Sequence, residues 1–172
     1  MGHVVITLAL AAALTAGAAR AAPQATPVCA PVNAAKDVEA VVRGWFGAFG
    51  RNDYPAGYAL QAPGFYTYDN GQRLDGTALG DLLRTAKAAG FKVEWNIGAV
   101  DVHAGCDEAW AAWVNKGSSG SSGAVEPVTW LESAGLRYQD GRWRMEFLNS
   151  SRVPPPNQNP AAQPARGRHQ RG

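Results

Sequence analysis

The sequence is poor in the residue types that most often carry metal or redox chemistry. Among its 172 residues are two cysteines and three histidines, and only His103 lies away from both ends of the chain. A structural zinc site needs four such ligands close together, so we expect no metal ion. The glycine-rich run from Gly117 to Gly123 is interspersed with serine and is not followed by lysine, unlike a phosphate-binding loop. With no nucleotide-binding motif and no nucleophile elbow, we expect no cofactor.

Charge is also scarce, and it is unevenly distributed. Charged residues make up 17% of the chain, whose net charge is +2. Residues 22–151 contain 11 Lys/Arg and 14 Asp/Glu, whereas residues 152–172 contain four arginines and no acid. The folded part is therefore acidic, and the basic character of the whole chain predicts no nucleic-acid-binding domain. The basic end is compatible with an anionic partner or with a plain solvated tail.

No apolar run near the start is long enough for a typical membrane-spanning helix. The uncharged stretch Val4–Ala19 would form a helix of about 24 Å, against a hydrocarbon core of about 30 Å. Ala19-Arg20-Ala21 follows with the small-x-small pattern of a signal peptidase site. We therefore predict that residues 1–21 are a signal peptide cleaved after Ala21. This predicts a periplasmic or secreted protein without a stable membrane anchor, the alternative being an uncleaved anchor helix.

The remaining chain divides into three parts. Residues 22–33 form an N-terminal extension, and residues 34–151 are long enough for one domain with its own core. Residues 152–172 contain three consecutive prolines and no aromatic residue. Such a segment buries too little apolar surface to offset its ordering entropy, so we predict a disordered tail.

The two cysteines, Cys29 and Cys106, are far apart in the sequence. In an oxidising compartment two cysteines in one chain favour a disulfide, which would join the N-terminal extension to a turn between strands. Two unpaired thiols remain the alternative, because sequence alone does not show whether the residues meet.

Apolar spacing predicts three helices in the first half of the domain. Asp37–Phe49 carries apolar residues at spacings of three and four, with Asn33 as a possible cap. Asp53 begins a short second helix that ends near Leu60, and Asp75–Ala89 is the third. Between them, residues 64–68 and 72–74 predict a short hairpin around an Asp-Asn-Gly turn.

From Phe91 onward the apolar period changes from helical spacing to two. Residues 93–103, 108–116, 125–138 and 143–149 read as long antiparallel strands, with Gly117–Gly123 as a flexible hairpin tip. Three helices and a hairpin followed by this meander predict an α+β fold. We expect the helices to pack on a curved antiparallel sheet and to leave a conical pocket at one end.

Several short strings resemble the NTF2-like (nuclear transport factor 2-like) superfamily, in its SnoaL-like bacterial branch. They are Asp69-Asn70-Gly71, Trp130-Leu131-Glu132-Ser133 and Asp140-Gly141-Arg142-Trp143-Arg144. The resemblance covers about residues 34–151 and implies an NTF2-like, cystatin-like α+β roll. The superfamily includes isomerases, cyclases and dehydratases as well as non-enzymatic binding and assembly domains. Many of its members dimerise through the open face of the sheet. These strings are fold markers and predict fold better than function.

The end of the last strand departs from the pattern of this branch. Where His-Ser-Thr often stands, this chain has Asn149-Ser150-Ser151. An amide takes up no proton near neutral pH, which weakens the case for acid–base chemistry.

A few polar residues are candidates for the pocket. Alternation places Glu132 among apolar neighbours on the face that we expect to be inner, where desolvation would suit it to proton transfer. Asp101 and His103 share a strand face and could form an oriented base, although both also fit an exposed turn. On the same alternation, Asn149 and Trp130 face inward, and the hairpin residues Tyr66, Tyr68 and Asp69 could rim the pocket. The candidate ligand-binding residues are thus Tyr66, Tyr68, Asp69, Trp130, Glu132 and Asn149.

Three functional hypotheses follow. The first is an exported domain that binds a small apolar or amphipathic molecule without strong catalytic activity. The second is an isomerase, cyclase or dehydratase using Glu132, or Asp101 with His103, for proton transfer. The third is a homodimeric assembly domain that associates through its sheet face.

Overall fold

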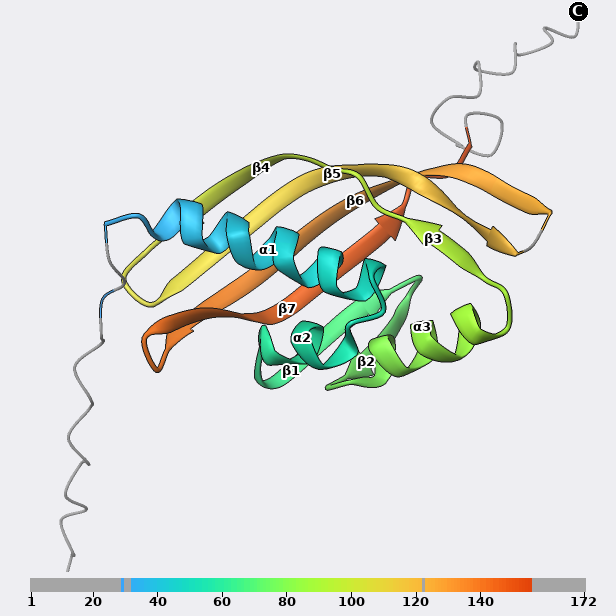
Figure 1. Ribbon diagram of the computed structural model, residues 1–172. Helices are drawn as coiled ribbons and strands as arrows, with labels where there is room; N and C mark the ends of the chain where they lie inside the picture. The colour runs from blue at the N-terminus through green and yellow to red at the C-terminus, as the bar shows by residue number, and fades with distance from the viewer. Residues whose placement is uncertain (1–28, 30–31, 122, 156–172) are drawn as a thin grey trace, which may run out of the picture.

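The computed structural model describes Cys29, residues 32–121 and residues 123–155. The predicted signal peptide and tail residues 156–172 lie outside these residues. In Figure 1 the described chain forms a long curved sheet, with helix α1 lying along its concave side and α2 and α3 near one edge.

Three helices precede the long strands, as the apolar spacing predicts. They are α1 (Ala34–Gly50), α2 (Tyr54–Ala59) and α3 (Ala78–Ala88). α1 buries the predicted stripe, because Val38, Val42 and Trp45 recur on the side that faces the sheet. The Asp53 carboxylate accepts a hydrogen bond from the Ala56 amide at 3.2 Å and caps α2. α3 begins three residues later than predicted, because the preceding strand continues to Asp75.

Seven strands form one sheet in the order β2-β1-β7-β6-β5-β3, with β4 also paired to β5. Their bounds are β1 (Gln61–Asp69), β2 (Gln72–Asp75), β3 (Lys92–Glu94), β4 (Ile97–Ala104), β5 (Glu108–Ser121), β6 (Ala124–Gln139) and β7 (Arg142–Arg152). β4 to β7 form the predicted antiparallel meander, except that the first predicted strand, residues 93–103, is broken at residues 95–96 into β3 and β4. The predicted α+β architecture is therefore confirmed.

The sheet is mixed, which corrects the prediction of a wholly antiparallel one. β1 runs parallel to β7, with Tyr66 opposite Phe147 and Asp69 opposite Ser150. A hairpin cannot join parallel strands, and here residues 70–141 separate the two partners in sequence. Local turn signals therefore carry no information about this pairing.

The hairpin tip predicted at Gly117–Gly123 is too long, because residues 117–121 belong to β5 and β6 begins at Ala124. They pair with β6 on one side and with β3 on the other, where Glu94 lies opposite Ser118 and Lys92 opposite Gly120. A Cβ at Gly117 would collide with the Glu94 carbonyl oxygen, so the small residues permit the close approach of β3.

Two bulges shift the alternation of side chains between the faces. One lies in β7, where Gly135 pairs with Phe147 but the next β6 residue pairs with Met145, which leaves Glu146 as the extra residue. The other lies in β4 between Ile97 and Val100. Because one extra residue reverses every side chain beyond it, positions predicted past each bulge lie on the opposite face.

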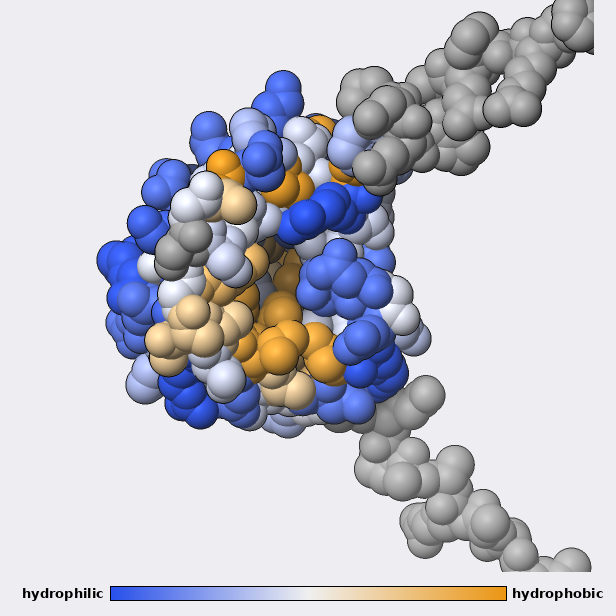
Figure 2. Space-filling view, turned by 90° about the vertical axis from the view of Figure 1, so that its right-hand side faces the viewer, coloured by the Kyte–Doolittle hydropathy of each residue, from blue (hydrophilic) through white to orange (hydrophobic). Residues whose placement is uncertain are grey.

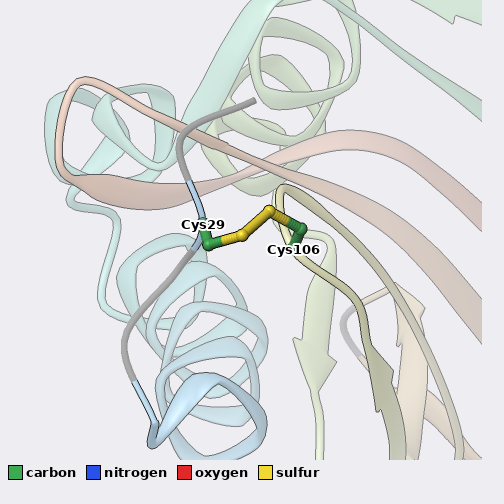
Figure 3. Close-up of a disulfide and its surroundings, with 2 residues drawn as sticks. All are labelled: Cys29 and Cys106. Atoms are coloured by element: carbon green, nitrogen blue, oxygen red, sulfur yellow. A yellow bond between two sulfur atoms is a disulfide. The ribbon is translucent and has the colours of Figure 1, made fainter. Parts of the chain in front are cut away.

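A disulfide ties the start of the fold to the β4–β5 turn. Cys29 and Cys106 are bonded, with their Cα atoms 4.2 Å apart, and Figure 3 shows the bridge beside α1. The predicted pairing is therefore confirmed. It closes 77 residues of chain, for which loop entropy predicts a stabilisation of about 4 kcal/mol.

The folded part extends beyond the predicted boundary at residue 151. Arg152 pairs with Trp130 at the end of β7, and the Val153 amide donates to the Thr129 carbonyl at 2.8 Å. Arg152 thus belongs to the sheet and not to the tail. Across the described ranges, no helix has the length and apolar character needed to cross a membrane.

Candidate functional site

A pocket of about 340 Å³ lies between α1, α3 and the concave face of the sheet. Figure 2 shows it as a hollow with apolar residues inside and hydrophilic residues around its mouth. Most of its walls are apolar, and they comprise Trp45, Phe46, Leu79, Leu82, Leu83, Ala86, Phe91, Val93, Trp95, Trp130 and Leu148. The polar lining residues are Asp69, Asn70, Ser119, Glu132, Ser150 and Arg152. Its size and apolar character are those of a site for a small organic ligand.

Glu132 is the buried polar centre of this pocket. It is only 5% exposed, and its Oε2 accepts hydrogen bonds from Trp113 Nε1 at 2.7 Å and Asn115 Nδ2 at 2.9 Å. Its Oε1 accepts one from Ser150 Oγ at 2.9 Å. All three donors are neutral, and no Lys or Arg in the described ranges forms an ion pair with Glu132.

Burial raises the pKa of Glu132 above its usual range. The hydrogen bonds from Asn115, Ser150 and Trp113 act in the opposite direction, because they stabilise the ionised form. The negative charge of Asp69 adds a smaller upward shift. Glu132 thus keeps its proton to a higher pH than an exposed glutamate does.

Asp69 is the second carboxyl group of the pocket. It lies at the end of β1, and its Oδ2 accepts a hydrogen bond from Asn70 Nδ2 at 3.0 Å. Burial raises its pKa, while that hydrogen bond and the positive charge of Arg152 lower it. Arg152 itself donates to Ser119 Oγ at 2.7 Å, and its guanidinium lies 5.9 Å from the Trp130 ring centre.

The structure separates the six predicted ligand-binding residues into two groups. Asp69, Trp130 and Glu132 line the pocket. Tyr66 and Tyr68 instead project from the outer face of β1, where both rings pack against Phe147. Asn149 pairs with Tyr68 and lies on this outer face as well, since the β7 bulge turns it away from the pocket. Its predicted inward orientation is wrong, and Ser150 faces inward in its place.

Asp101 and His103 also lie on the outer face. Both are exposed, and the β4 bulge explains why Val100 and Val102 turn inward instead. The His103 ring stacks on Trp110 with 4.0 Å between ring centres and 11° between planes. Neither residue lines the pocket, so the predicted Asp101–His103 pair does not face the bound ligand's expected place.

Several polar residues of the site were not predicted from the sequence, among them Asn115, Ser150 and Arg152. Asn115 and Ser150 hold Glu132, and Arg152 lies at the end of β7. Asn115 could have been found, because it alternates in phase with Trp113 along β5. Ser150 and Arg152 could not, since the bulge that brings them inward leaves no clear local signal.

The polar groups at the described site are carboxylates, hydroxyls, amides, indole N–H groups and one guanidinium. Within the described part of the chain, no three His, Cys, Asp or Glu side chains are grouped so as to hold a metal ion. The Trp45 indole N–H has no acceptor among the described residues. The arrangement can enclose an apolar body, exchange hydrogen bonds with a polar group and move a proton at Glu132.

Solved structures with a similar fold include ketosteroid isomerase-like and NTF2-like proteins. A ketosteroid isomerase-like protein from Erwinia carotovora atroseptica superposes with a TM-score of 0.61 at 21% identity, over 73% of this chain and 100% of the other. The NTF2-like fold is confirmed. An NTF2-like protein of unknown function from Pseudomonas putida superposes with a TM-score of 0.59 at 21% identity, over 71% and 88% of the two chains.

The NTF2-like fold also extends to proteins of a different kind. The association domain of C. elegans CaMKII superposes with a TM-score of 0.56 at 17% identity, over 69% of this chain and 98% of the other. No protein-family model and no curated protein matches the sequence. Because the identities are below 25%, the likeness establishes the fold, and the function must be argued from the site.

Proposed function

We propose that this protein is an exported domain whose pocket binds a small apolar or amphipathic molecule. The observation that carries the proposal is the apolar hollow of about 340 Å³ with the buried carboxyl group of Glu132 in its wall. An apolar cavity with a few convergent polar groups is the usual form of a small-molecule site. The apolar walls would supply affinity, and Glu132, Ser150 and Asp69 would orient the polar end of the ligand.

Filling the pocket tests this proposal. The probe is N-phenyl-1-naphthylamine, a neutral apolar molecule whose fluorescence rises when it leaves water. Ala86 lines the pocket, so Ala86→Trp should abolish the fluorescence increase by occupying the space. Ala88 lies on the same helix but is exposed, so Ala88→Trp is a matched control and should leave binding intact. Equal binding by wild type and Ala86→Trp would place the probe elsewhere and refute the proposal.

A second candidate function is proton transfer by Glu132. It is favoured by one observation, the burial of this carboxyl group in the pocket with its pKa raised. A suitable test follows α-hydrogen exchange of cyclohexanone in D₂O by NMR. Catalysed exchange that disappears in Glu132→Gln would support this function. Exchange no faster than in buffer, or unaffected by the substitution, would reject it for this class of ketone.

Export is the part of the proposal that concerns localisation. The disulfide fits an oxidising compartment, and cleavage after Ala21 would leave Cys29 in the mature chain. Mass spectrometry of protein purified from an exporting host should give a chain that begins at Ala22 and weighs two daltons less than its reduced form. A chain that still begins at Met1 would contradict export by this signal.

The outer sheet face supports a further proposal, that the domain forms homodimers. Trp110, Val114 and Leu131 are exposed there on adjacent strands β5 and β6. Exposed large apolar side chains on one face often mark an interface. The association domain of C. elegans CaMKII has a similar fold, which is compatible with self-association of this domain.

A further inference from the structure

The polar groups of the pocket carry more negative than positive charge. Asp69 and Glu132 line it with carboxyl groups, and Arg152 is the one cationic side chain in its described lining. Arg152 is already engaged by Ser119, while Glu132 is held by neutral donors alone. A buried carboxylate without a cationic partner is costly, so a positive group brought by a ligand would be stabilised there.

The aromatic walls of the pocket favour the same kind of ligand. Trp45, Trp95 and Trp130 line it, together with Phe46 and Phe91. Tryptophan faces attract cations within about 6 Å of the ring centre. Two of these rings already lie near a cation of the protein itself. The Arg152 guanidinium is 5.9 Å from the centre of the Trp130 ring, and the Lys87 ammonium is 5.8 Å from the centre of the Trp95 ring.

Lys87 does not supply the missing charge. Its Nζ donates to the Phe49 carbonyl at 2.8 Å and to Asn52 Oδ1 at 3.0 Å, at the end of α1. Lys87 therefore caps the C-terminal end of α1, and it is not among the residues that line the pocket.

We propose that the pocket selects ligands whose polar end is a positively charged amine attached to an apolar body. This inference rests on the proposed function, because it names the class of molecule that the same pocket accepts. The ammonium group would donate to the carboxylates of Glu132 and Asp69, and the apolar body would lie against the tryptophan and leucine walls. Arg152 would oppose the bound cation and limit its affinity.

Calorimetric titration with three probes of equal chain length tests the inference: octylammonium, 1-octanol and octanoate. In the wild type we expect octylammonium to bind at least about tenfold more tightly than octanoate, with octanol between them. The preference should weaken as salt is added, because part of the site is exposed. Octanoate binding as tightly as octylammonium would overturn the inference and would point to recognition by Arg152.

Variants of the charged residues test which side chains cause the preference for octylammonium. In Glu132→Gln the amide oxygen can still accept from Trp113 and Asn115, and the amide nitrogen can donate to Ser150 Oγ. This variant should therefore fold but bind octylammonium no more tightly than octanol. Arg152→Gln should increase the preference, and Glu146→Gln on the outer face should leave it unchanged.

Asp69→Asn provides a second test should Glu132→Gln fail to fold, because Asp69 is only partly buried. It should reduce the preference for octylammonium several-fold. A preference that survives at full strength in every folded variant of the two carboxyl groups would overturn the inference. If octanol binds, Ala86→Trp abolishes that binding and octylammonium is not preferred, the inference is rejected but the proposed pocket is supported. If none of the three probes binds, the result counts against both the inference and the proposed function.

Discussion

Glu132 and Glu146 lie on adjacent strands of one sheet, but they face opposite environments. Glu132 projects into the concave side, where neutral donors surround it and most of the pocket walls are apolar. Glu146 lies on the outer side and accepts from Arg137 Nε at 3.1 Å, and Arg137 also forms an ion pair with Glu108 at 3.1 Å. A glutamate side chain is thus a candidate functional group on the concave face, at Glu132, and part of a charge network on the outer face, at Glu146.

The two faces differ in aromatic residues as well as in charge. On β5, Trp113 points inward and is 5% exposed, while Trp110 points outward and is 51% exposed. The concave face therefore combines packing with a ligand-sized hollow, whereas the outer face presents large side chains to a potential partner. This difference in environment, more than residue type, separates structural from functional positions in this domain.

The largest expected difference between the faces is in stability. Trp113→Ala should lower the free energy of unfolding by about 3–5 kcal/mol, because it empties a packed site and removes a hydrogen bond to Glu132. Trp110→Ala on the same strand should cost about 1 kcal/mol or less. Urea denaturation at low protein concentration measures both, and equal losses would mean that the faces are not distinguished as described.

The next effect is on the pH dependence of stability. Because the folded-state pKa of Glu132 is raised, its contribution to stability is fully present below its ordinary pKa and is lost as pH rises through the folded pKa. Glu132→Gln removes this loss, so the variant should gain stability relative to wild type between acid and neutral pH. Thermal unfolding across this range gives the difference, with Glu146→Gln as the control for removing one negative charge. Parallel profiles for wild type and Glu132→Gln would contradict the buried state of this carboxyl group.

The smallest effect on folding should come from a charge on the outer face. Leu131 is 53% exposed there, so Leu131→Arg should change the monomer's free energy of unfolding by no more than about 0.5 kcal/mol. If this face forms the proposed homodimer, the same substitution should reduce the mass measured by light scattering to that of one chain. A wild type that is monomeric at high concentration would remove the dimer proposal.

The sequence predicted the helices and strands well because their signals are local. Apolar spacing located α1, the Asp53 cap located α2, and period two located the meander. The parallel β1–β7 pairing could not be predicted this way, since it joins segments that are distant in sequence. The composition of Gly117–Gly123 was misleading, because glycine here permits a neighbouring strand to approach.

The candidate site was predictable only up to the bulges. Trp130 and Glu132 lie on the uninterrupted strand β6, and alternation placed both correctly on the inner face. Asn149 lies beyond the bulge in β7, so alternation placed it on the wrong face. His103 lies beyond the bulge in β4 and is exposed, which was one of the two alternatives that the sequence left open. A single extra residue carries little sequence signal but reverses every side chain that follows.

On the proposed function, the concave pocket, and not the outer face, receives a small apolar or amphipathic ligand. An NMR titration of the disulfide-bonded protein with 1-octanol tests it most directly, because each amide reports its own surroundings. We expect saturable shifts at Leu83, Glu132 and Leu148, with little change at Trp110 and Phe147. Shifts confined to the outer-face residues, or none at saturating octanol, would contradict it.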